Sequence, residues 1–310
     1  GLVGSEMCIR DSYIAIEFLN IHRGYSVKEI CIALKLNRSS YYKWKKRKQS
    51  KRELLNLQIT EYVKEYYEES NGVLGYRQMS ITINREKIDE LPHRINVKRI
   101  HRIMRILGLK SVIRRKRPDY VKSTPEITAE NVLNRDFKAT VPFEKWLTDV
   151  TEFKYYVGPE VKKLYLSAIL DLYDRRIVAY KIGDSNNNEL VFTTFDEATS
   201  LYPDAKPIFH SDRGFQYTNK FFHQKIVDAG MIQSMSRVGR CLDNAPMEGW
   251  WGILKSEMYY LKKFTSRESL VSAIENYIHF YNTRRYQKRL NCMTPCAVSY
   301  THLRAHETSL

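Results

Sequence analysis

The order of apolar segments after residue 141 is the feature that most constrains the fold of this chain. Three segments have the apolar and aromatic composition of strands, and the last two lie so close together that they predict a hairpin. They are 145–153 (KWLTDVTEF), 163–173 (KLYLSAILDLY) and 175–182 (RRIVAYKI). Helix-like segments then alternate with short apolar runs. The predicted helices cover 187–201, 219–228, 245–259 and 267–281, and the predicted short strands cover 207–210 and 232–235. Three antiparallel strands followed by this alternation predict an α/β fold, a sheet with helices on both faces.

Positive charge is concentrated in the first part of the chain. The formal net charge is +16. Residues 13–120 hold 25 Lys and Arg against 11 Asp and Glu, a net charge of +14, whereas residues 141–310 hold 22 against 19, a net charge of +3. A basic module followed by a nearly neutral one indicates a polyanion-binding part attached to another domain. The alternative is a generally basic, solvated surface, which this segregation disfavours.

Residues 26–48 have the pattern of a helix-turn-helix motif. Ser26 and Glu29 have the spacing of a capping box at a helix start. The apolar face expected for this helix comprises Val27, Ile30, Cys31 and Leu34. After a short break, a second helix begins near Arg38 and carries Lys43 among aromatic and basic residues. Because such basic second helices enter the major groove, we expect Arg38 and Lys43 to contact DNA. A plain helical hairpin is the alternative.

A second helical group follows between residues 57 and 110. Helices are predicted over 57–68 and 76–84, and Asn96 is placed to cap a third. The inward residues of the third helix are expected to be Val97, Ile100, Met104 and Leu107. Its outer face carries Lys98, Arg99, Arg102 and Arg105, which are well placed to meet phosphates. For any one of these four residues, a solvated charge is the alternative.

Residues 111–140 lack a regular periodicity and are predicted to be a basic linker that runs along DNA. Arg114 and Arg115 belong to a run of four basic residues that is followed by Pro118.

The two ends of the chain, 1–12 and 299–310, resemble peptides translated from sequencing-adapter DNA, so we leave them out of the fold prediction. A DNA-binding module is therefore expected over 13–110 and a catalytic core over 141–297.

The remaining bulk features predict a cytoplasmic protein. No apolar run approaches the roughly 18 residues that span a bilayer, no secretory signal opens the chain, and no membrane partner is expected. The five cysteines form no CxxC pair, and we interpret them as reduced thiols and not as a disulfide framework or a zinc site.

Three acidic residues stand where a catalytic site could assemble. Asp149 lies within the first strand, Asp212 directly follows the short strand before it, and Glu248 lies on a helix, with 35 residues between Asp212 and Glu248. Carboxylates at strand ends can converge over a sheet, and their mutual repulsion is relieved by hard divalent cations such as Mg²⁺ or Mn²⁺. Asn244 and Lys255 fall on the same helix face as Glu248, which suits a phosphate-bearing substrate. Taken singly, each acid is more often a turn residue or a solvated charge.

The chain resembles insertion-sequence transposases with a retroviral-integrase-type core, and more narrowly the second-reading-frame product of two-frame bacterial insertion sequences. The resemblance runs from about residue 20 to 297 and rests on ordered motifs: GYRQMS, WLTDVTEF, HSDRGFQYTN, DNAPMEGWWGILKSE and YNTRRYQKRLNCMTP. In the last motif, Gln287 and Asn291 stand where relatives often have His and Gly.

The resemblance implies a DDE-type transposase with an RNase H-like core, a mixed five-stranded sheet with helices on both faces. Asp149, Asp212 and Glu248 would hold two Mg²⁺ or Mn²⁺ ions, with Asp149 bridging both. Water would be the nucleophile for nicking and a 3′-hydroxyl the nucleophile for joining. Asn244 and Lys255 would bind DNA near the transferred end. The partners implied are double-stranded DNA (terminal inverted repeats and target), further copies of the chain in a synaptic complex, and an upstream-frame DNA-binding product joined by frameshifting.

Three other functions are compatible with parts of the pattern. One is a DNA-binding regulator of transposition whose core no longer catalyses, and the presence of all three carboxylates argues against such a loss. A phage or retroelement integrase would be favoured by an N-terminal His/Cys zinc module, and none is visible in the sequence. A simple RNase H-type nuclease is disfavoured by the large basic N-terminal module.

Overall fold

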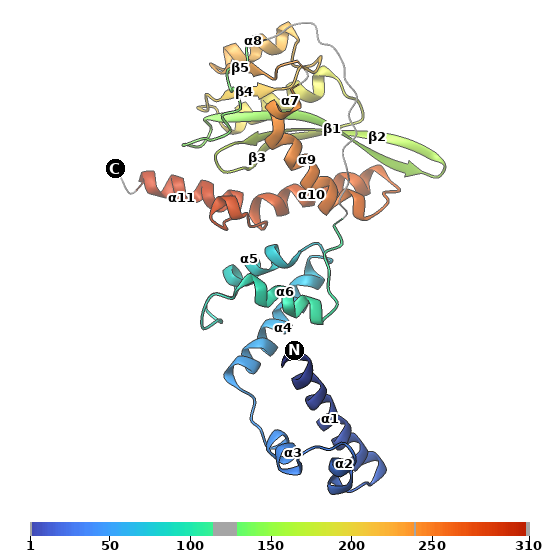
Figure 1. Ribbon diagram of the computed structural model, residues 1–310. Helices are drawn as coiled ribbons and strands as arrows, with labels where there is room; N and C mark the ends of the chain where they lie inside the picture. Colours follow the sequence, from blue (N-terminus) through green and yellow to red (C-terminus); the bar gives the residue numbers. More distant parts are fainter. Residues whose placement is uncertain (1, 114–128, 239, 308–310) are drawn as a thin grey trace. The chain divides into compact units, whose positions relative to one another are not determined.

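The computed structural model describes residues 2–113, 129–238 and 240–307, which fall into two compact units, 1–62 and 63–310 (Figure 1). Among these residues, no helix has the length and apolar character needed to cross a membrane.

The first unit is helical. It contains α1 (Leu2–Arg23), α2 (Val27–Ala33), α3 (Arg38–Lys45) and the first part of α4 (Lys51–Glu69). The capping box predicted at Ser26 is formed, since Ser26 Oγ accepts from the Glu29 backbone N–H and the Glu29 carboxylate accepts from the Ser26 N–H, each at 3.2 Å. The core of the unit comprises Tyr13, Ile16, Ile30, Cys31 and Tyr41. Leu34 is a correction to the predicted apolar face: it is 45% exposed, because α2 ends at this residue and the chain turns away.

Two further helices follow α4 in the second unit. They are α5 (Tyr76–Glu86) and α6 (Val97–Ile106). Asn96 caps α6 as predicted, its side chain accepting from the Lys98 N–H at 2.8 Å. Ile100, Ile103 and Met104 form the buried face of α6, whereas Val97 is 38% exposed and was wrongly expected to point inward. The buried face therefore begins one turn later than the sequence pattern indicated.

A mixed five-stranded sheet organises the rest of the second unit, as predicted. Its strands are β1 (Lys145–Val157), β2 (Glu160–Asp171), β3 (Ile177–Gly183), β4 (Ile208–Ser211) and β5 (Ile232–Met235), in the order β3-β2-β1-β4-β5. β1, β2 and β3 are antiparallel neighbours, whereas β4 pairs parallel with β1 and with β5. β1 and β2 extend beyond the predicted apolar segments because their outer ends pair with each other up to Val157 and Glu160.

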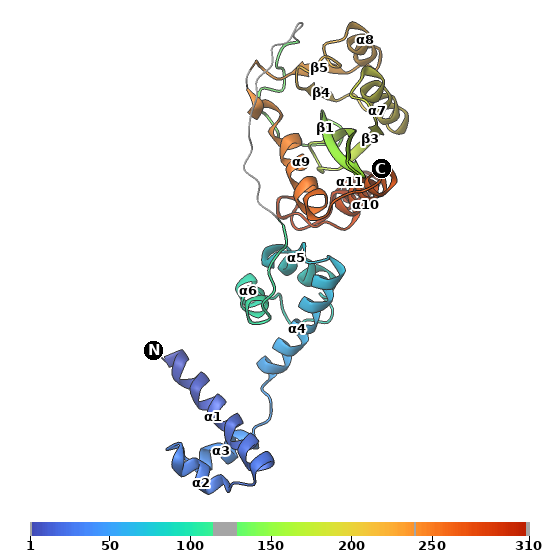
Figure 2. The ribbon, with the colours of Figure 1, turned by 90° about the vertical axis from the view of Figure 1, so that its right-hand side faces the viewer.

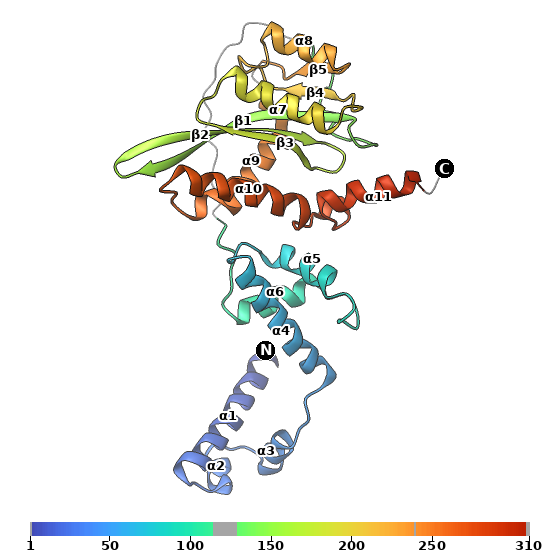
Figure 3. The same ribbon diagram turned by 180° about the vertical axis from the view of Figure 1, so that it is seen from behind.

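Helices cover both faces of this sheet (Figures 1 and 3). One face packs against α7 (Asn188–Leu201) and α8 (Lys220–Asp228), and Trp146 of β1 lies in that core. The other face packs against α9 (Ala245–Glu257) and α10 (Arg267–Thr283), and Leu147 lies there. Successive side chains of a strand point to opposite faces, so every second residue of β1 faces α9. Figure 2 gives a side view of the sheet, with α7 on one side and α9 on the other. The chain continues through η3 (Lys288–Leu290) to α11 (Pro295–Glu307).

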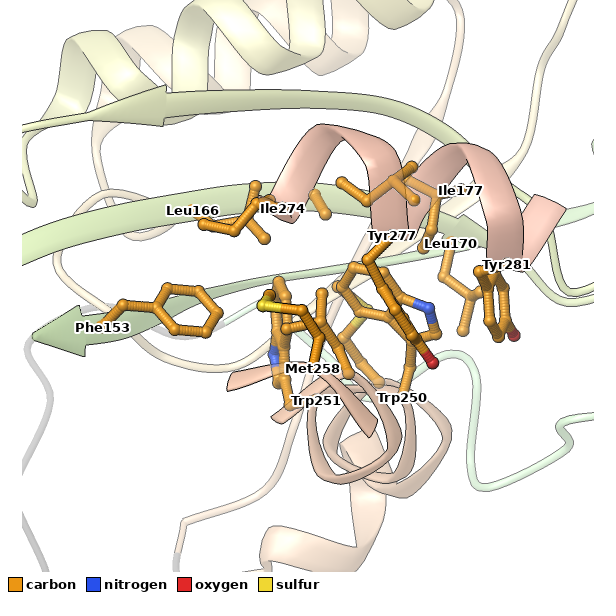
Figure 4. Packing of buried hydrophobic residues seen from close by; sticks show 14 of the residues in the cluster. Phe153, Leu166, Leu170, Ile177, Trp250, Trp251, Met258, Ile274, Tyr277 and Tyr281 are labelled. Carbon is orange, nitrogen blue, oxygen red and sulfur yellow. The ribbon is translucent and has the colours of Figure 1, made fainter. Parts of the chain in front are cut away.

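Aromatic residues dominate the core between β1–β3 and the helices α9 and α10. Trp250 and Trp251 of α9 pack below the strands, together with Tyr277 and Tyr281 of α10 (Figure 4). Leu166 of β2 is fully buried in the same cluster. This core holds α9 against the sheet and so determines where the side chains of α9 lie.

Leu166→Ala should lower the free energy of unfolding of the second unit by about 2–5 kcal/mol, because it removes buried apolar volume and leaves a cavity. Val161→Ala is the matched control, since Val161 lies on the same strand but is 54% exposed; its effect should stay within about 0.5 kcal/mol. Urea unfolding monitored by tryptophan fluorescence measures both. Equal effects would contradict the position of the core.

Candidate active site

The parallel pairing of β1 with β4 places Asp149 beside Asp212. Lys145 is paired with Ile208, and Leu147 with His210. Asp149 and Asp212 each lie two residues beyond that last pair, so continuing the register places them opposite each other. Neighbouring strands are about 4.8 Å apart. Two carboxyl groups from segments far apart in the sequence therefore meet at the carboxyl end of β4.

Asp149 is held on both of its carboxylate oxygens. It lies on the face of β1 that packs against α9, and its Oδ2 accepts from the indole Nε1 of Trp251 at 3.0 Å. Its Oδ1 accepts from the Val150 backbone N–H at 2.8 Å. These two donors orient the carboxylate and favour its ionised form.

The loop after β4 positions Asp212. The Gly214 N–H donates to Asp212 Oδ1 at 2.8 Å. A Cβ at Gly214 would lie 3.0 Å from that same oxygen and 3.0 Å from Gln216 Oε1, so any larger residue would press on the carboxylate. His210, on β4, is fully buried, and its two ring nitrogens are hydrogen-bonded with the hydroxyls of Ser234 and Ser236. Burial lowers the pKa of His210 to about 4, so it is a neutral structural residue.

Glu248 reaches the same region from α9. It is half-buried in the first turn of the helix, and its negative charge raises the pKa of Asp149. Lys255 lies two turns further along α9, with its ammonium 5.3 Å from the centre of the Phe153 ring. Asn244 is the N-cap of α9 and not an interior helix residue; it is buried, and its Nδ2 donates to the Thr148 carbonyl at 3.2 Å.

The electrostatics show that the carboxyl groups repel one another. Burial, then the charges of Asp212 and Glu248, raise the pKa of Asp149 to about 8, against the lowering effect of its two hydrogen bonds. Burial also raises the pKa of Asp212. The buried hydroxyl of Tyr217, which is hydrogen-bonded with Thr148 Oγ1, has a pKa raised by burial and by both aspartates. This cluster of negative charge is one that a bound cation would stabilise.

The donor set fits a hard divalent cation, because all three side chains offer carboxylate oxygens. Among the described residues, no three His, Cys, Asp or Glu side chains stand close enough to hold one metal ion together. Both carboxylate oxygens of Asp149 and the Oδ1 of Asp212 accept hydrogen bonds from protein donors.

A fourth acidic residue, which the sequence analysis missed, fixes the start of α9. Asp243 is fully buried and accepts from Arg135 Nε at 2.6 Å and from Arg237 through Nε and Nη2 at 2.8 and 2.9 Å. The Arg237 guanidinium holds the pKa of Asp243 well below its usual range. These bonds tie the segment before β1 and the segment after β5 to the N-terminus of the helix that carries Glu248.

Tyr217 was likewise not recognised as part of the site from the sequence, whereas the helical spacing placed Trp251 on the face of Glu248 and Lys255 without giving it a role. An indole or a phenol in an apolar run is ordinary core material, and only the fold shows which polar atom it presents to a carboxylate. The available signal was the spacing of Trp251, three residues after Glu248 and four before Lys255, which puts it on their helix face.

The residues expected to contact DNA lie on several elements. Arg38 and Lys43 are exposed on α3. Lys98, Arg102 and Arg105 are exposed on α6, and Arg99 is half-buried there. Arg114 and Arg115 lie outside the described residues.

Comparison with known families matches most of the chain. Residues 139–241 and 248–301 match models described as "Integrase core domain", and residues 55–117 match an "HTH-like domain". Residues 14–64 match a model described as "Putative ATPase subunit of terminase (gpP-like)".

Individual relatives are transposases. The chain is 37% identical over 272 residues to the "Putative transposase InsK for insertion sequence element IS150" of Escherichia coli (strain K12), covering 87% of this chain and 92% of the relative. It is 43% identical over 202 residues to an "Uncharacterized transposase-like protein" of Haemophilus influenzae, covering 65% of this chain and 92% of the relative. Among solved structures, the HTLV-2 integrase catalytic core domain in complex with magnesium is similar at 19% identity, with a TM-score of 0.41, over 52% of this chain and 99% of that chain.

Asp243→Ala should destabilise the second unit by about 1–3 kcal/mol at neutral pH, because it removes charge-assisted hydrogen bonds whose arginine partners are partly solvated. Since the folded-state pKa of Asp243 is depressed, its contribution is present above the unfolded pKa of about 3.9 and is lost as the pH falls through the folded value. Urea unfolding of both proteins at pH 7 and pH 5 should give the same difference. A difference that vanished by pH 5 would contradict this prediction.

Proposed function

Because the chain belongs to the insertion-sequence transposases with an integrase core, we propose that Asp149, Asp212 and Glu248 bind the divalent cations at which it cuts and joins DNA. As a transposase of this family, the protein binds DNA and carries out strand cleavage and strand transfer. The observation that carries the proposal is the register between β1 and β4, which brings Asp149 beside Asp212, with Glu248 adding its charge from α9.

Asp149, Asp212 and Glu248 would hold two Mg²⁺ or Mn²⁺ ions, for which carboxylate oxygens are suitable ligands. When bound, such a pair of ions activates an attacking oxygen and stabilises the leaving oxygen of a phosphodiester. By its resemblance to the family, the attacking oxygen would be that of water for nicking and that of a 3′-hydroxyl of DNA for joining.

The protein's own residues prepare this site. Trp251 Nε1 and the Val150 N–H hold the Asp149 carboxylate in one orientation, and the Gly214 N–H holds that of Asp212. Asn244 fixes the start of α9 against the Thr148 carbonyl, one residue before Asp149. Lys255, on the same helix as Glu248, supplies positive charge for the DNA end.

The remaining basic residues serve DNA binding. We propose that residues 13–110 recognise the terminal inverted repeats, with Arg38 and Lys43 on α3 and Lys98, Arg99, Arg102 and Arg105 on α6 as phosphate or base contacts. Arg114 and Arg115 of the basic linker 111–140 would follow the DNA towards the core at 141–297. Joining two ends requires several copies of the chain in one complex, and fusion with an upstream-frame product would complete end recognition. We expect the protein to work at the bacterial nucleoid in the cytoplasm.

The runner-up is a catalytically inactive regulator of transposition that binds the same DNA. All three carboxylates are present, and Asp212 and Glu248 lie close enough to act electrostatically on Asp149. This arrangement favours the enzyme.

Asp149→Asn, Asp212→Asn and Glu248→Gln should each abolish Mg²⁺-dependent cleavage while leaving DNA binding nearly intact, because metal coordination supplies several kcal/mol of transition-state stabilisation. Asp204→Asn is the control: Asp204 lies in the catalytic domain but is exposed, so this variant should cleave like the parent. The assay uses DNA carrying the element's ends, with the chain alone and with its upstream-frame fusion. Cleavage retained by one of the three variants would exclude that residue. Intact binding with no cleavage by either parent form would favour the regulator.

Gly214→Ala should reduce cleavage without weakening DNA binding, since its Cβ would press on Asp212 Oδ1 and Gln216 Oε1. A Cβ at Gly252, on α9, meets no atom within 4 Å, so Gly252→Ala is a matched control and should keep full activity. Single-turnover cleavage rates compare the two. Equal rates would show that the loop after β4 does not need a glycine.

A further inference from the structure

The outer part of β1 has an edge that no described strand pairs with. β4 pairs with β1 only as far as Leu147, whereas β2 pairs with the opposite edge of β1 up to Val157. The outer ends of β1 and β2 project together past α7 (Figures 1 and 3). The segment after α9 covers the edge that β4 leaves. The Tyr156 N–H donates to the Phe264 carbonyl at 2.9 Å, and the Tyr259 hydroxyl is hydrogen-bonded at 2.9 Å with both the N–H and the carbonyl of Lys154.

An open pocket lies where this segment meets β1. Its volume is about 450 Å³, within the range of roughly 300–1,000 Å³ typical of ligand sites. Three of its eight described lining residues are lysines, four are aromatic, and none is Asp or Glu. The lysines are Lys154, Lys262 and Lys263, and all three side chains are exposed. A ligand in the pocket can therefore reach their ammonium groups.

The positive charge of this pocket is not balanced within the described part of the chain. On the neighbouring strand β2, Lys162 lies 3.6 Å from the Glu160 carboxylate and Lys163 lies 2.9 Å from that of Glu152. None of the three lysines of the pocket forms an ion pair with a described carboxylate. Charged side chains of one sign gathered without counter-charges favour a ligand of the opposite sign.

Two of the lysines are positioned by aromatic rings. The Lys263 ammonium lies 4.3 Å from the centre of the Tyr156 ring, and the Lys262 ammonium lies 5.2 Å from that of Phe264. A cation–π contact attracts the ammonium to the ring face but leaves its charge in place. The rings therefore hold the lysines at the pocket and keep them available to an anion.

The pocket continues a line of positive charge that starts beside the proposed metal site. Lys255 of α9 has its ammonium 5.3 Å from the centre of the Phe153 ring, and the Tyr259 ring lies 5.0 Å from the same ring. Lys154 directly follows Phe153, five residues along β1 from Asp149. At about 3.4 Å per residue these five residues span about 17 Å. A DNA strand advances about 3.4 Å per nucleotide, so the same distance corresponds to about five nucleotides.

We propose that this pocket binds the backbone of a DNA strand that leaves the metal site, with Lys154, Lys262 and Lys263 contacting phosphates about five nucleotides from the bond that is cut. A DNA strand carries phosphates at regular intervals, so it can occupy the metal site and this pocket together, which a small anion cannot. This inference rests on the proposed function and adds a DNA contact at a stated distance from the reacting phosphate.

The first test measures DNA affinity against salt concentration in the absence of divalent metal. Lys154→Gln and Lys263→Gln each remove one ammonium group from the pocket. Each should weaken binding of the element's ends about fivefold at roughly 0.15 M salt and reduce the slope of log K against log salt by about 0.9, the contribution of one phosphate contact. Lys263→Arg keeps the charge and should bind like the parent. Lys162→Gln is the matched control, because Lys162 lies on the same hairpin but is paired with Glu160; its slope should equal that of the parent.

The second test locates the contact on the DNA. A single phosphate is replaced by a neutral methylphosphonate, one linkage at a time, on both sides of the bond that is cut. The parent should lose about fivefold in affinity when the neutral linkage lies about five nucleotides from that bond on one side. Lys154→Gln or Lys263→Gln should lose nothing further there, because the contact is already absent. Lys162→Gln should respond like the parent. If the parent and both pocket variants responded alike at every linkage, the lysines would meet no phosphate and the proposal would be wrong.

Two controls separate DNA binding from other roles of the pocket. Urea unfolding should show that both pocket variants are as stable as the parent; lower stability with an unchanged salt slope would mean that the lysines only support packing, which would overturn the proposal. Sedimentation without DNA should show the same self-association for the parent and the variants. Loss of self-association with an unchanged slope would assign the pocket to a second copy of the chain and overturn the DNA assignment.

The outcomes also distinguish this inference from the function on which it rests. DNA binding and Asp212-dependent cleavage by the parent, with no change in the pocket variants, would overturn the inference alone. A parent that binds no DNA at any salt concentration would overturn both.

Discussion

The parallel pairing of β1 with β4 is the constraint on which the site depends. It sets Asp149 and Asp212 side by side although 62 residues separate them in the chain. Hydrophobic packing on both faces of the sheet holds that register, because a shift of one residue would turn Trp146 and Leu147 towards the wrong cores. The core therefore supplies the free energy that keeps two like charges together, and a cation would relieve the repulsion.

The helix α9 is the second element on which the chemistry depends, because it packs in the aromatic core and also donates a hydrogen bond to a carboxylate of the site. Trp251 is part of the aromatic core and also donates to Asp149 Oδ2. Trp250 packs beside it in the same core, with the two ring centroids 4.5 Å apart.

Much of the fold could be predicted from local patterns. The strand β5 and the start of α3 lie where the sequence placed them, because short apolar runs and cap residues such as Asn37 act locally. Val97 and Leu34 were misplaced, since periodicity gives the direction of a face but not where a helix leaves its partners. The outer ends of β1 and β2 were missed because their residues pair with each other beyond the apolar core.

The sequence by itself determined the types of residue available for chemistry: three acids in recognisable motifs, a basic N-terminal module and the elements that carry them. Tertiary structure alone decided which polar atoms meet. The bond from the Trp251 indole to Asp149 and the bond from Arg135 to the buried Asp243 each join segments that are distant in the chain. Motifs record local chemistry, whereas hydrogen bonds and burial depend on register and packing between elements, and no local pattern contains that information.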